Sequence, residues 1–181
     1  MVDPLIHDTI VYFLAALFFY SGLQKWIHHR YFILSLAGYR LFPGKLVSIL
    51  SFLIPLSEWA ASLCLFFPGG QTYGLILALG LLGVFSLVIF IKLLQGEEPA
   101  DCGCFGPGLK LELSWILLLR NLVLLGMSAL SLCPQSHRPL TFWDQLFSPW
   151  ITFVFCLTFA AWNRILSNNS LPLLKKKNLY E

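Results

Sequence analysis

Five apolar runs alternate with polar stretches along this chain. The runs cover about residues 6–23, 46–67, 73–94, 114–132 and 147–166. Each is close to the ~20 residues that an α-helix needs to cross the hydrocarbon core of a bilayer. Because that core offers no water to satisfy backbone groups, each run is expected to be helical. The pattern predicts an all-α, polytopic membrane bundle with a four-helix core and a fifth, C-terminal transmembrane helix.

The polar stretches between the runs predict the connections. Segment 28–45 mixes basic, histidine and tyrosine residues with apolar ones, which favours an amphipathic segment lying on the membrane surface. Pro68-Gly69-Gly70 predicts a tight connection between two spans, and Ser114 is a good N-cap for the fourth. The tail after about Leu166, which ends in three lysines, is expected to be disordered or bound to the membrane surface.

Composition agrees with the hydropathy pattern. Of 181 residues, 57% are hydrophobic and 12% are charged, whereas a soluble domain carries about 25% charged residues. The net charge of +3 gives no indication of nucleic-acid binding. No signal peptide is recognised, so the first run is expected to remain a transmembrane helix. We divide the chain into a membrane domain, 1–133, and an extra segment, 134–181, with a loop, the fifth helix and the basic tail.

Basic residues are concentrated on one side of the predicted bundle. The loop after the first span, the loop after the third span and the tail share that side, here called end B; the opposite side is end A. The basic residues on or near end B are Lys25, Arg30, Arg40, Lys45, Lys92, Lys110, Arg164, Lys175, Lys176 and Lys177. End A has Arg138 and begins with Asp3 and Asp8. The positive-inside rule then makes end B cytoplasmic and places the N-terminus outside the cell (inner) membrane.

The most reactive side chains cluster in Asp101-Cys102-Gly103-Cys104-Phe105-Gly106. One glycine separates Cys102 from Cys104, so the two sulfurs are close enough to pair or to share a reaction. A disulfide this short deviates from relaxed geometry, and strained disulfides are the easily reduced ones. The alternative is a Gly/Pro turn that contains two cysteines by coincidence. The tightness of the cluster favours redox or ligand chemistry.

The other three cysteines give weaker signals. Cys64, Cys133 and Cys156 are expected to be small apolar core residues. Cys64 and Cys133 both lie toward end A, so a disulfide between them is the alternative. A zinc site needs four ligands, and the Cys102–Cys104 pair has no second cluster at a suitable spacing, so no metal site is predicted.

Charged residues within the apolar runs are costly and usually face a functional interior. Glu58 lies about twelve residues into the second run, or ~18 Å from end B, and Arg120 lies ~9 Å from the same end. An arginine side chain could bridge much of that difference, so a Glu58–Arg120 pair is expected. Asn121 adjoins Arg120, and Lys25 closes the first run at end B.

This convergence suggests two interpretations. Cations and a helix N-terminus stabilise the thiolate, which is the reactive form of cysteine, and Glu58 could exchange a proton with a thiol or a quinone. The alternative is a structural ion pair that locks helix packing. The candidate site residues are Cys102, Cys104, Arg120, Glu58, Lys25 and Asn121.

Several short stretches carry a family resemblance. They are Gly22-Leu23-Gln24-Lys25, Leu41-Phe42-Pro43, Pro55-Leu56-Ser57-Glu58, Cys102-Gly103-Cys104-Phe105-Gly106, Leu113-Ser114-Trp115 and Arg120-Asn121. Together they resemble the methylamine-utilisation protein MauE family, within the wider DoxX-like group of small helical membrane proteins. The resemblance covers about Val11 to Leu132, and the Cys-Gly-Cys-Phe-Gly stretch is its specific part.

The resemblance implies a four-helix core similar in layout to quinone-linked disulfide enzymes of the vitamin K epoxide reductase or DsbB type. It also implies a role in maturing a disulfide-rich periplasmic amine dehydrogenase, alongside a thioredoxin-like partner, although no residue here specifies methylamine. Such periplasmic work would require end B outside, in conflict with the charge distribution. The leading hypothesis is a membrane thiol–disulfide oxidoreductase completed by a quinone or a thioredoxin-like partner. The alternative is a non-catalytic scaffold that docks a redox partner through the cysteine loop.

Overall fold

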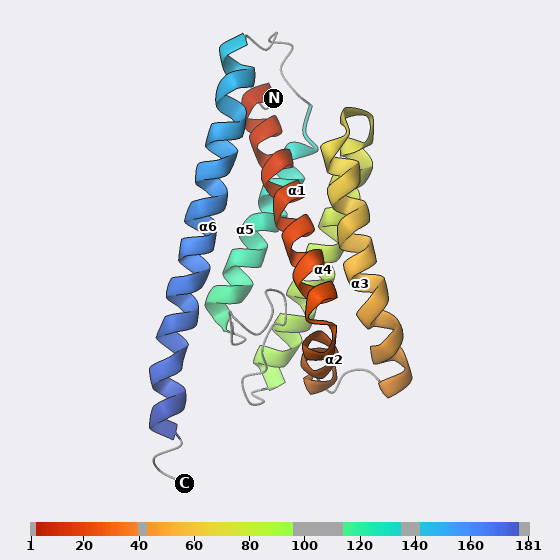
Figure 1. Ribbon diagram of the computed structural model, residues 1–181, viewed down its shortest axis with the longest axis vertical. Helices are drawn as coiled ribbons and strands as arrows, with labels where there is room; N and C mark the ends of the chain where they lie inside the picture. The colour runs from red at the N-terminus through yellow and green to blue at the C-terminus, as the bar shows by residue number, and fades with distance from the viewer. Residues whose placement is uncertain (1–2, 40–42, 96–113, 135–141, 178–181) are drawn as a thin grey trace.

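The computed structural model contains helices and no strand in the residues it describes, which are 3–39, 43–95, 114–134 and 142–177 (Figure 1). The helices are α1 (Pro4–Ile27), α2 (His29–Gly38), α3 (Gly44–Phe66), the short 3₁₀ helix η1 (Pro68–Gly70), α4 (Gln71–Gln95), α5 (Trp115–Ser131) and α6 (Phe142–Lys177). They follow the five apolar runs and the short polar segment closely. The predicted all-α membrane bundle is therefore confirmed.

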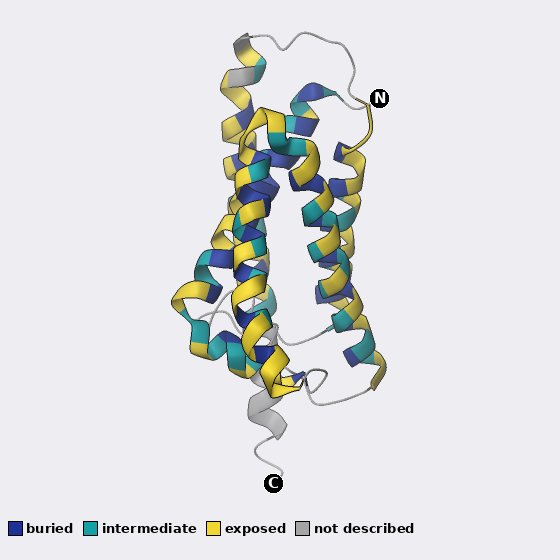
Figure 2. Ribbon diagram, turned by 90° about the vertical axis from the view of Figure 1, so that its right-hand side faces the viewer, coloured by how far each residue is buried: buried dark blue, intermediate teal, exposed yellow. Residues whose placement is uncertain are grey.

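Four helical stretches are long and apolar enough to cross a membrane. They are Pro4–Ile27, Gly44–Phe66, Pro68–Gln95 and Leu146–Ser167. Helix α5 has 17 residues, about 26 Å at 1.5 Å per residue, which is near the lower limit for a span. Large apolar side chains are exposed on the outward faces of the bundle, as expected where lipid replaces water as solvent (Figure 2). The chain is a multi-pass membrane protein.

Helix α1 lies at the centre of the arrangement (Figure 1). It packs against α2, α3, α4, α5 and α6, and it supplies much of the apolar core through Val11, Leu14 and Phe18. Helices α3, α4 and α5 alternate in direction, and α6 lies along α1 in the same direction. As a result α1, α4 and α6 finish toward end B, whereas α3 and α5 begin there.

Small residues and an interhelical hydrogen bond allow the helices to approach closely, as is common in membrane bundles. A Cβ atom on Gly74 of α4 would lie 2.8 Å from the backbone nitrogen of Leu65 in α3. Ser62 of α3 donates a hydrogen bond of 2.8 Å to the carbonyl oxygen of Ala15 in α1. These contacts hold α1, α3 and α4 at fixed positions around the residues described below.

Three connections can be compared with the sequence predictions. The Ser114 side chain accepts a hydrogen bond from the Leu117 amide at 3.3 Å, so the predicted N-cap is confirmed. The polar segment forms α2, which buries Phe32 and Leu36 and therefore packs into the bundle as well as lying at its end. The helical backbone of α6 continues to Lys177, so the first alternative for the tail, disorder, is wrong up to that residue. The second alternative, binding to the membrane surface, stays a prediction.

Replacing Gly74 by alanine tests the close approach of α3 and α4. Alanine favours a helix interior over glycine by roughly 0.5–1 kcal/mol, but at position 74 its methyl group would overlap the α3 backbone. We expect Gly74→Ala to destabilise the purified protein by about 1–3 kcal/mol, the usual cost of overpacking. Thermal unfolding in detergent, followed by tryptophan fluorescence, measures the change.

The matched control is Gly80→Ala in the same helix, because a Cβ atom there would meet nothing within 4 Å. It should leave the unfolding temperature unchanged or raise it slightly. Equal changes in the unfolding temperature of the two variants would contradict the close packing of α3 against α4.

Candidate functional site

A buried ion pair joins Lys25 in the last turn of α1 to Glu58 in the middle of α3. The two residues are 1% and 2% exposed, and the Lys25 ammonium contacts Glu58 Oε1. Ser21 lies one turn before Lys25 on the same helix. Its Oγ atom accepts a hydrogen bond from Lys25 Nζ and donates one to Glu58 Oε1, both at 3.1 Å. The lysine and the carboxylate are thus held by a shared hydroxyl group.

Aromatic rings from two further helices enclose the ammonium group of Lys25. Its Nζ atom lies 4.8 Å from the ring centre of Phe85 in α4 and 5.4 Å from that of Phe32 in α2. A cation over an aromatic face is attracted by the ring quadrupole, more strongly where water is excluded. Lys25 therefore contacts side chains from α2, α3 and α4 as well as from its own helix.

The direction of helical side chains explains why Lys25 reaches Glu58. In an α-helix the Cα–Cβ bond points toward the N-terminus. Lys25 lies near the end of α1, so its side chain extends back into the bundle and past Ser21, four residues earlier. Glu58 extends in the opposite sense, toward the start of α3 at end B. The two side chains therefore meet, although the sequence places Lys25 at end B and Glu58 ~18 Å from that end.

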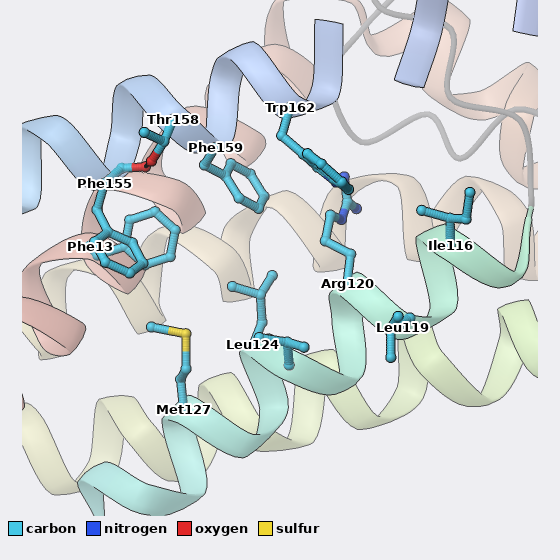
Figure 3. A pocket seen from close by; sticks show the side chains of 11 residues that line it. Phe13, Ile116, Leu119, Arg120, Leu124, Met127, Phe155, Thr158, Phe159 and Trp162 are labelled. Atoms are coloured by element: carbon cyan, nitrogen blue, oxygen red, sulfur yellow. Dashed lines mark hydrogen bonds between the residues drawn. The ribbon is translucent and has the colours of Figure 1, made fainter. Parts of the chain in front are cut away.

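The expected Glu58–Arg120 pair is wrong, because Lys25 takes the position at the carboxylate. Arg120 instead reaches across toward α6 (Figure 3). Its Nη1 atom donates a hydrogen bond of 2.7 Å to Oδ1 of Asn163 in α6. Its Nη2 atom lies 3.3 Å from Oδ1 of Asn121, the next residue of α5. The guanidinium group also lies 5.5 Å from the ring centre of Phe159. Arg120 thus joins α5 to α6.

The two polar groups nevertheless line one cavity. A space of about 30 Å³ lies between them, and Ser21, Glu58, Arg120 and Asn121 contribute its polar lining. Asn121 is 5% exposed, so it belongs to the interior of the bundle as expected. The structure therefore brings Lys25, Glu58, Arg120 and Asn121 together in one layer, here called the charged layer with Ser21 and Asn163 included.

Cys102 and Cys104 lie outside the described residues. The helix ends on either side of them, at Gln95 of α4 and Ser114 before α5, lie toward end B, the same end at which α1 finishes with Lys25 in its last turn (Figure 1). In the sequence, Cys102 and Cys104 lie between these two helix ends.

The described cysteines, Cys64, Cys133 and Cys156, are free thiols. The alternative Cys64–Cys133 disulfide is therefore wrong. Cys64 and Cys156 are half-buried and Cys133 is exposed, so Cys133 is not the core residue that was expected. Among the described residues, no group of three or more histidine, cysteine or acidic residues could hold a metal ion.

Sequence reasoning missed several members of this site. Asn163 was overlooked because the last apolar run was read for hydropathy alone, although an amide inside a span is itself a signal. Ser21 could have been found at four residues before Lys25, a spacing that places two side chains on one helix face. Nothing in the sequence singled out Phe32 or Phe85 among so many aromatic residues. Lys92 was counted as an end-B charge but is 7% exposed and lies inside the bundle.

A groove between α5 and α6 has a size and a lining that suit a flat organic cofactor. Its volume is about 390 Å³, and Phe13, Phe155, Phe159 and Trp162 supply aromatic walls (Figure 3). Arg120 and Thr158 provide polar groups in a lining that is otherwise mostly apolar. An uncharged ring with acceptor oxygens would match these walls.

The fold and the charged layer define a class: a small multi-pass membrane protein whose helices meet around buried ionic groups. The sequence model of the family described as "Methylamine utilisation protein MauE" matches residues 4–134. The chain belongs to this family. The match ends before α6 begins.

Individual relatives agree with the family match. The chain is 36% identical over 137 residues to the methylamine utilization protein MauE of Paracoccus versutus, covering 75% of this chain and 74% of that protein. The protein of the same name from Paracoccus denitrificans is 32% identical over 128 residues, with coverages of 71% and 69%. That of Methylorubrum extorquens is 30% identical over 121 residues, with coverages of 67% and 65%. No solved structure gives a significant match.

Replacing one partner of the ion pair should be far more damaging than replacing both. Lys25→Met leaves the buried Glu58 carboxylate without its cation, and Glu58→Gln leaves the ammonium without its anion. Removing one partner of a buried pair costs about 3–5 kcal/mol, whereas an apolar pair of similar volume is often neutral. We expect each single variant to lower the unfolding temperature strongly and Lys25→Met/Glu58→Leu to recover most of the loss.

Thermal unfolding and membrane yield of the three variants give the comparison. Lys45→Met serves as the control, because Lys45 is exposed on α3 and its loss should change neither quantity. If the double variant lost as much as the two single variants combined, the two residues would not be coupled as an ion pair.

Proposed function

We propose that this protein is a membrane thiol–disulfide redox protein that supports disulfide formation, isomerisation or another redox step in the maturation of a partner protein. Cys102 and Cys104 are the exchanging pair, and the charged layer tunes them. The observation that carries the proposal is the position of this layer, which is buried in the half of the bundle toward end B, where α4 ends and α5 begins on either side of the cysteines in the sequence.

The proposed reaction is a two-step thiol–disulfide exchange. A thiolate of the partner attacks one sulfur of the Cys102–Cys104 disulfide, and the other sulfur leaves as a thiolate. The partner's second thiolate then attacks its own sulfur in the mixed disulfide and releases the reduced pair. The partner loses two electrons, Cys102 and Cys104 gain them, and the two protons of the partner dithiol remain on the reduced pair. A thioredoxin-like protein, with two closely spaced cysteines, is the kind of partner that this chemistry suits.

The charged layer supports this chemistry in two ways. Thiol–disulfide exchange proceeds through thiolates, which cations and helix N-termini stabilise. Arg120 lies ~9 Å along α5 from Ser114, and the N-terminus of α5 begins there. The second contribution is the buried carboxylate of Glu58 in the same layer, which can exchange a proton with a thiol or a quinone. A bundle held together only by apolar packing would not need this many ionic groups, because each is costly in a membrane.

A membrane quinone is the two-electron oxidant that this proposal names for regenerating the disulfide. The α5–α6 groove supports it, because aromatic rings line the walls and the Arg120 guanidinium can donate to an acceptor oxygen. Its outer lining residues Leu119 and Val123 are 62% and 55% exposed, so a lipid-soluble molecule can enter from the bilayer. When bound, a quinone accepts two electrons and two protons.

The proposed location is the cell (inner) membrane with the N-terminus outside and end B cytoplasmic. Arg30, Lys45 and Arg164 are exposed and count toward the positive-inside rule. Lys25 and Lys92 do not count as loop charges, because they are buried in the bundle. After Lys25 and Lys92 are left out, the excess of basic residues at end B still favours that end as the cytoplasmic side.

A non-catalytic scaffold is the second candidate function. It is favoured by the contacts that side chains of the charged layer make between helices, with Lys25 on Glu58 and Arg120 on Asn163. In that case the cysteine segment docks a redox partner without exchanging electrons. Arg120→Met should then prevent accumulation of the protein, whereas cysteine variants should remain active.

Serine variants of the two cysteines separate these functions. Two relatives carry the name of methylamine utilisation proteins in Paracoccus, so growth on methylamine of a Paracoccus denitrificans strain lacking its own MauE is a suitable assay. The wild-type chain should restore growth, and Cys102→Ser and Cys104→Ser should abolish it at unchanged protein levels. Cys64→Ser and Cys133→Ser are matched controls and should restore growth. Full growth with either Cys102→Ser or Cys104→Ser would refute the redox proposal in favour of the scaffold.

Thiol trapping on intact cells tests the side of the membrane. A variant that keeps only Cys102 and Cys104 is treated with a membrane-impermeant maleimide before and after reduction. With end B cytoplasmic, labelling should require opening of the membrane. Labelling after external reduction alone would place an oxidised pair outside, overturn the charge-based topology and support maturation of an exoplasmic partner.

A further inference from the structure

Glu58, which lines the small cavity in the charged layer, has one unsatisfied carboxylate oxygen. Its Oε1 atom contacts Lys25 and Ser21, whereas its Oε2 atom is buried and has no hydrogen-bond partner in the part of the chain that the structure describes. Glu58 as a whole is 2% exposed. Leaving a buried acceptor unsatisfied costs about 1–3 kcal/mol, and more for a charged group. Such atoms in native proteins are almost always bonded to protein or to ordered water.

The dimensions and lining of the cavity meet the requirements for a water molecule. Its volume is about 30 Å³, above the ~10–15 Å³ that a water molecule needs. A buried water also needs two to four polar neighbours. Ser21, Glu58, Arg120 and Asn121 all line this space, and they come from α1, α3 and α5.

We propose that this cavity is a binding site for one ordered water molecule, which donates a hydrogen bond to Glu58 Oε2 and bonds on its other side to the Arg120–Asn121 corner of the cavity. The site takes a small neutral molecule with both donors and acceptors. It is too small for a quinone ring or for any group of several heavy atoms. The proposal does not depend on the cysteines or on the redox function.

The water would connect the two polar groups on either side of the cavity. On one side are Lys25, Ser21 and Glu58, and on the other are Arg120 and its acceptor Asn163. With the water in place, a continuous hydrogen-bonded chain crosses the bundle from α3 to α6. Helix α6 is then coupled to the ion pair through the water and Arg120.

Radiolytic footprinting of the full chain in lipid nanodiscs detects such a water. X-ray radiolysis turns ordered internal water into hydroxyl radicals, which modify adjacent side chains that lipid otherwise shields. Phe18 and Phe13 lie on the same helix and are each 2% exposed, but only Phe18 lines this cavity. We expect Phe18 to be modified several-fold faster than Phe13, as measured by mass spectrometry. Equal, slow modification of both rings would overturn the proposal.

Two cavity-filling variants test the location. Leu124→Phe and Leu17→Phe enlarge lining residues from different helices and should reduce Phe18 modification to the rate of Phe13. Leu122→Phe is the matched control, because Leu122 is 48% exposed on the outer face of α5, and it should leave the Phe18 rate unchanged. The use of two filling variants covers the case in which one fails to fold. Unchanged Phe18 modification in a folded filling variant would place the water elsewhere and refute the site.

The measurement is repeated on the Cys102→Ser/Cys104→Ser variant to keep the two proposals separate. Fast Phe18 modification should persist there, because the water is held by Glu58 and its neighbours. Loss of the signal in this variant alone would show that the cavity depends on the cysteine segment and would contradict the site as described. Failure of the growth assay, by contrast, leaves this measurement unaffected.

Discussion

The ion pair between Lys25 and Glu58 is the constraint around which the first four helices are arranged. An isolated charge in a membrane interior is expensive, and a buried pair is tolerated only where its geometry and hydrogen bonds are good. Here the carboxylate and the Ser21 hydroxyl bind the ammonium, and the rings of Phe32 and Phe85 enclose it. Any relative rotation of α1 and α3 would separate the charges. The pair therefore specifies which faces of the helices meet, a discrimination that apolar side chains in lipid supply only weakly.

Arg120 extends the same logic to the outer helices. Helix α6 packs along α1, and phenylalanine rings contribute to the contact. The ring centre of Phe13 lies 5.4 Å from that of Phe155 and 5.6 Å from that of Phe159. Such contacts tolerate sliding and rotation, since many arrangements bury similar ring area. The hydrogen bond from Arg120 to Asn163 does not, because it needs one rotation of α6 and one height. Apolar contacts thus hold the helix in place, and the polar contact selects its register.

The sequence predicted the helices well and identified Glu58 and Arg120 as charges within them, but it predicted neither the burial of Lys25 and Lys92 nor the pairing of Glu58. Hydropathy identifies spans because each must be apolar over a bilayer thickness, and Glu58 and Arg120 stood out as charges within them. Which charged side chains pair depends on how each helix is rotated about its axis and on the direction in which its side chains extend. The position of a residue along the helix gives neither. Lys25 looked interfacial because it closes the first apolar run. Its long side chain turns back into the bundle and contacts the Glu58 carboxylate, a contact that becomes visible only in the packed structure.

The shortness of α5 has a consequence for the lipid around it. Its 17 residues reach about 26 Å, less than the ~30 Å of a typical hydrocarbon core, whereas α4 has 25 residues and exceeds it. A short hydrophobic helix is accommodated by thinning of the adjacent bilayer. Lipid headgroups and their water therefore approach the α5 side of the protein more closely than the α4 side. Arg120, in the second turn of α5, benefits directly, because a thinner leaflet lowers the cost of holding its charge below the surface. The protein thus shapes the membrane on the side where the groove between α5 and α6 opens.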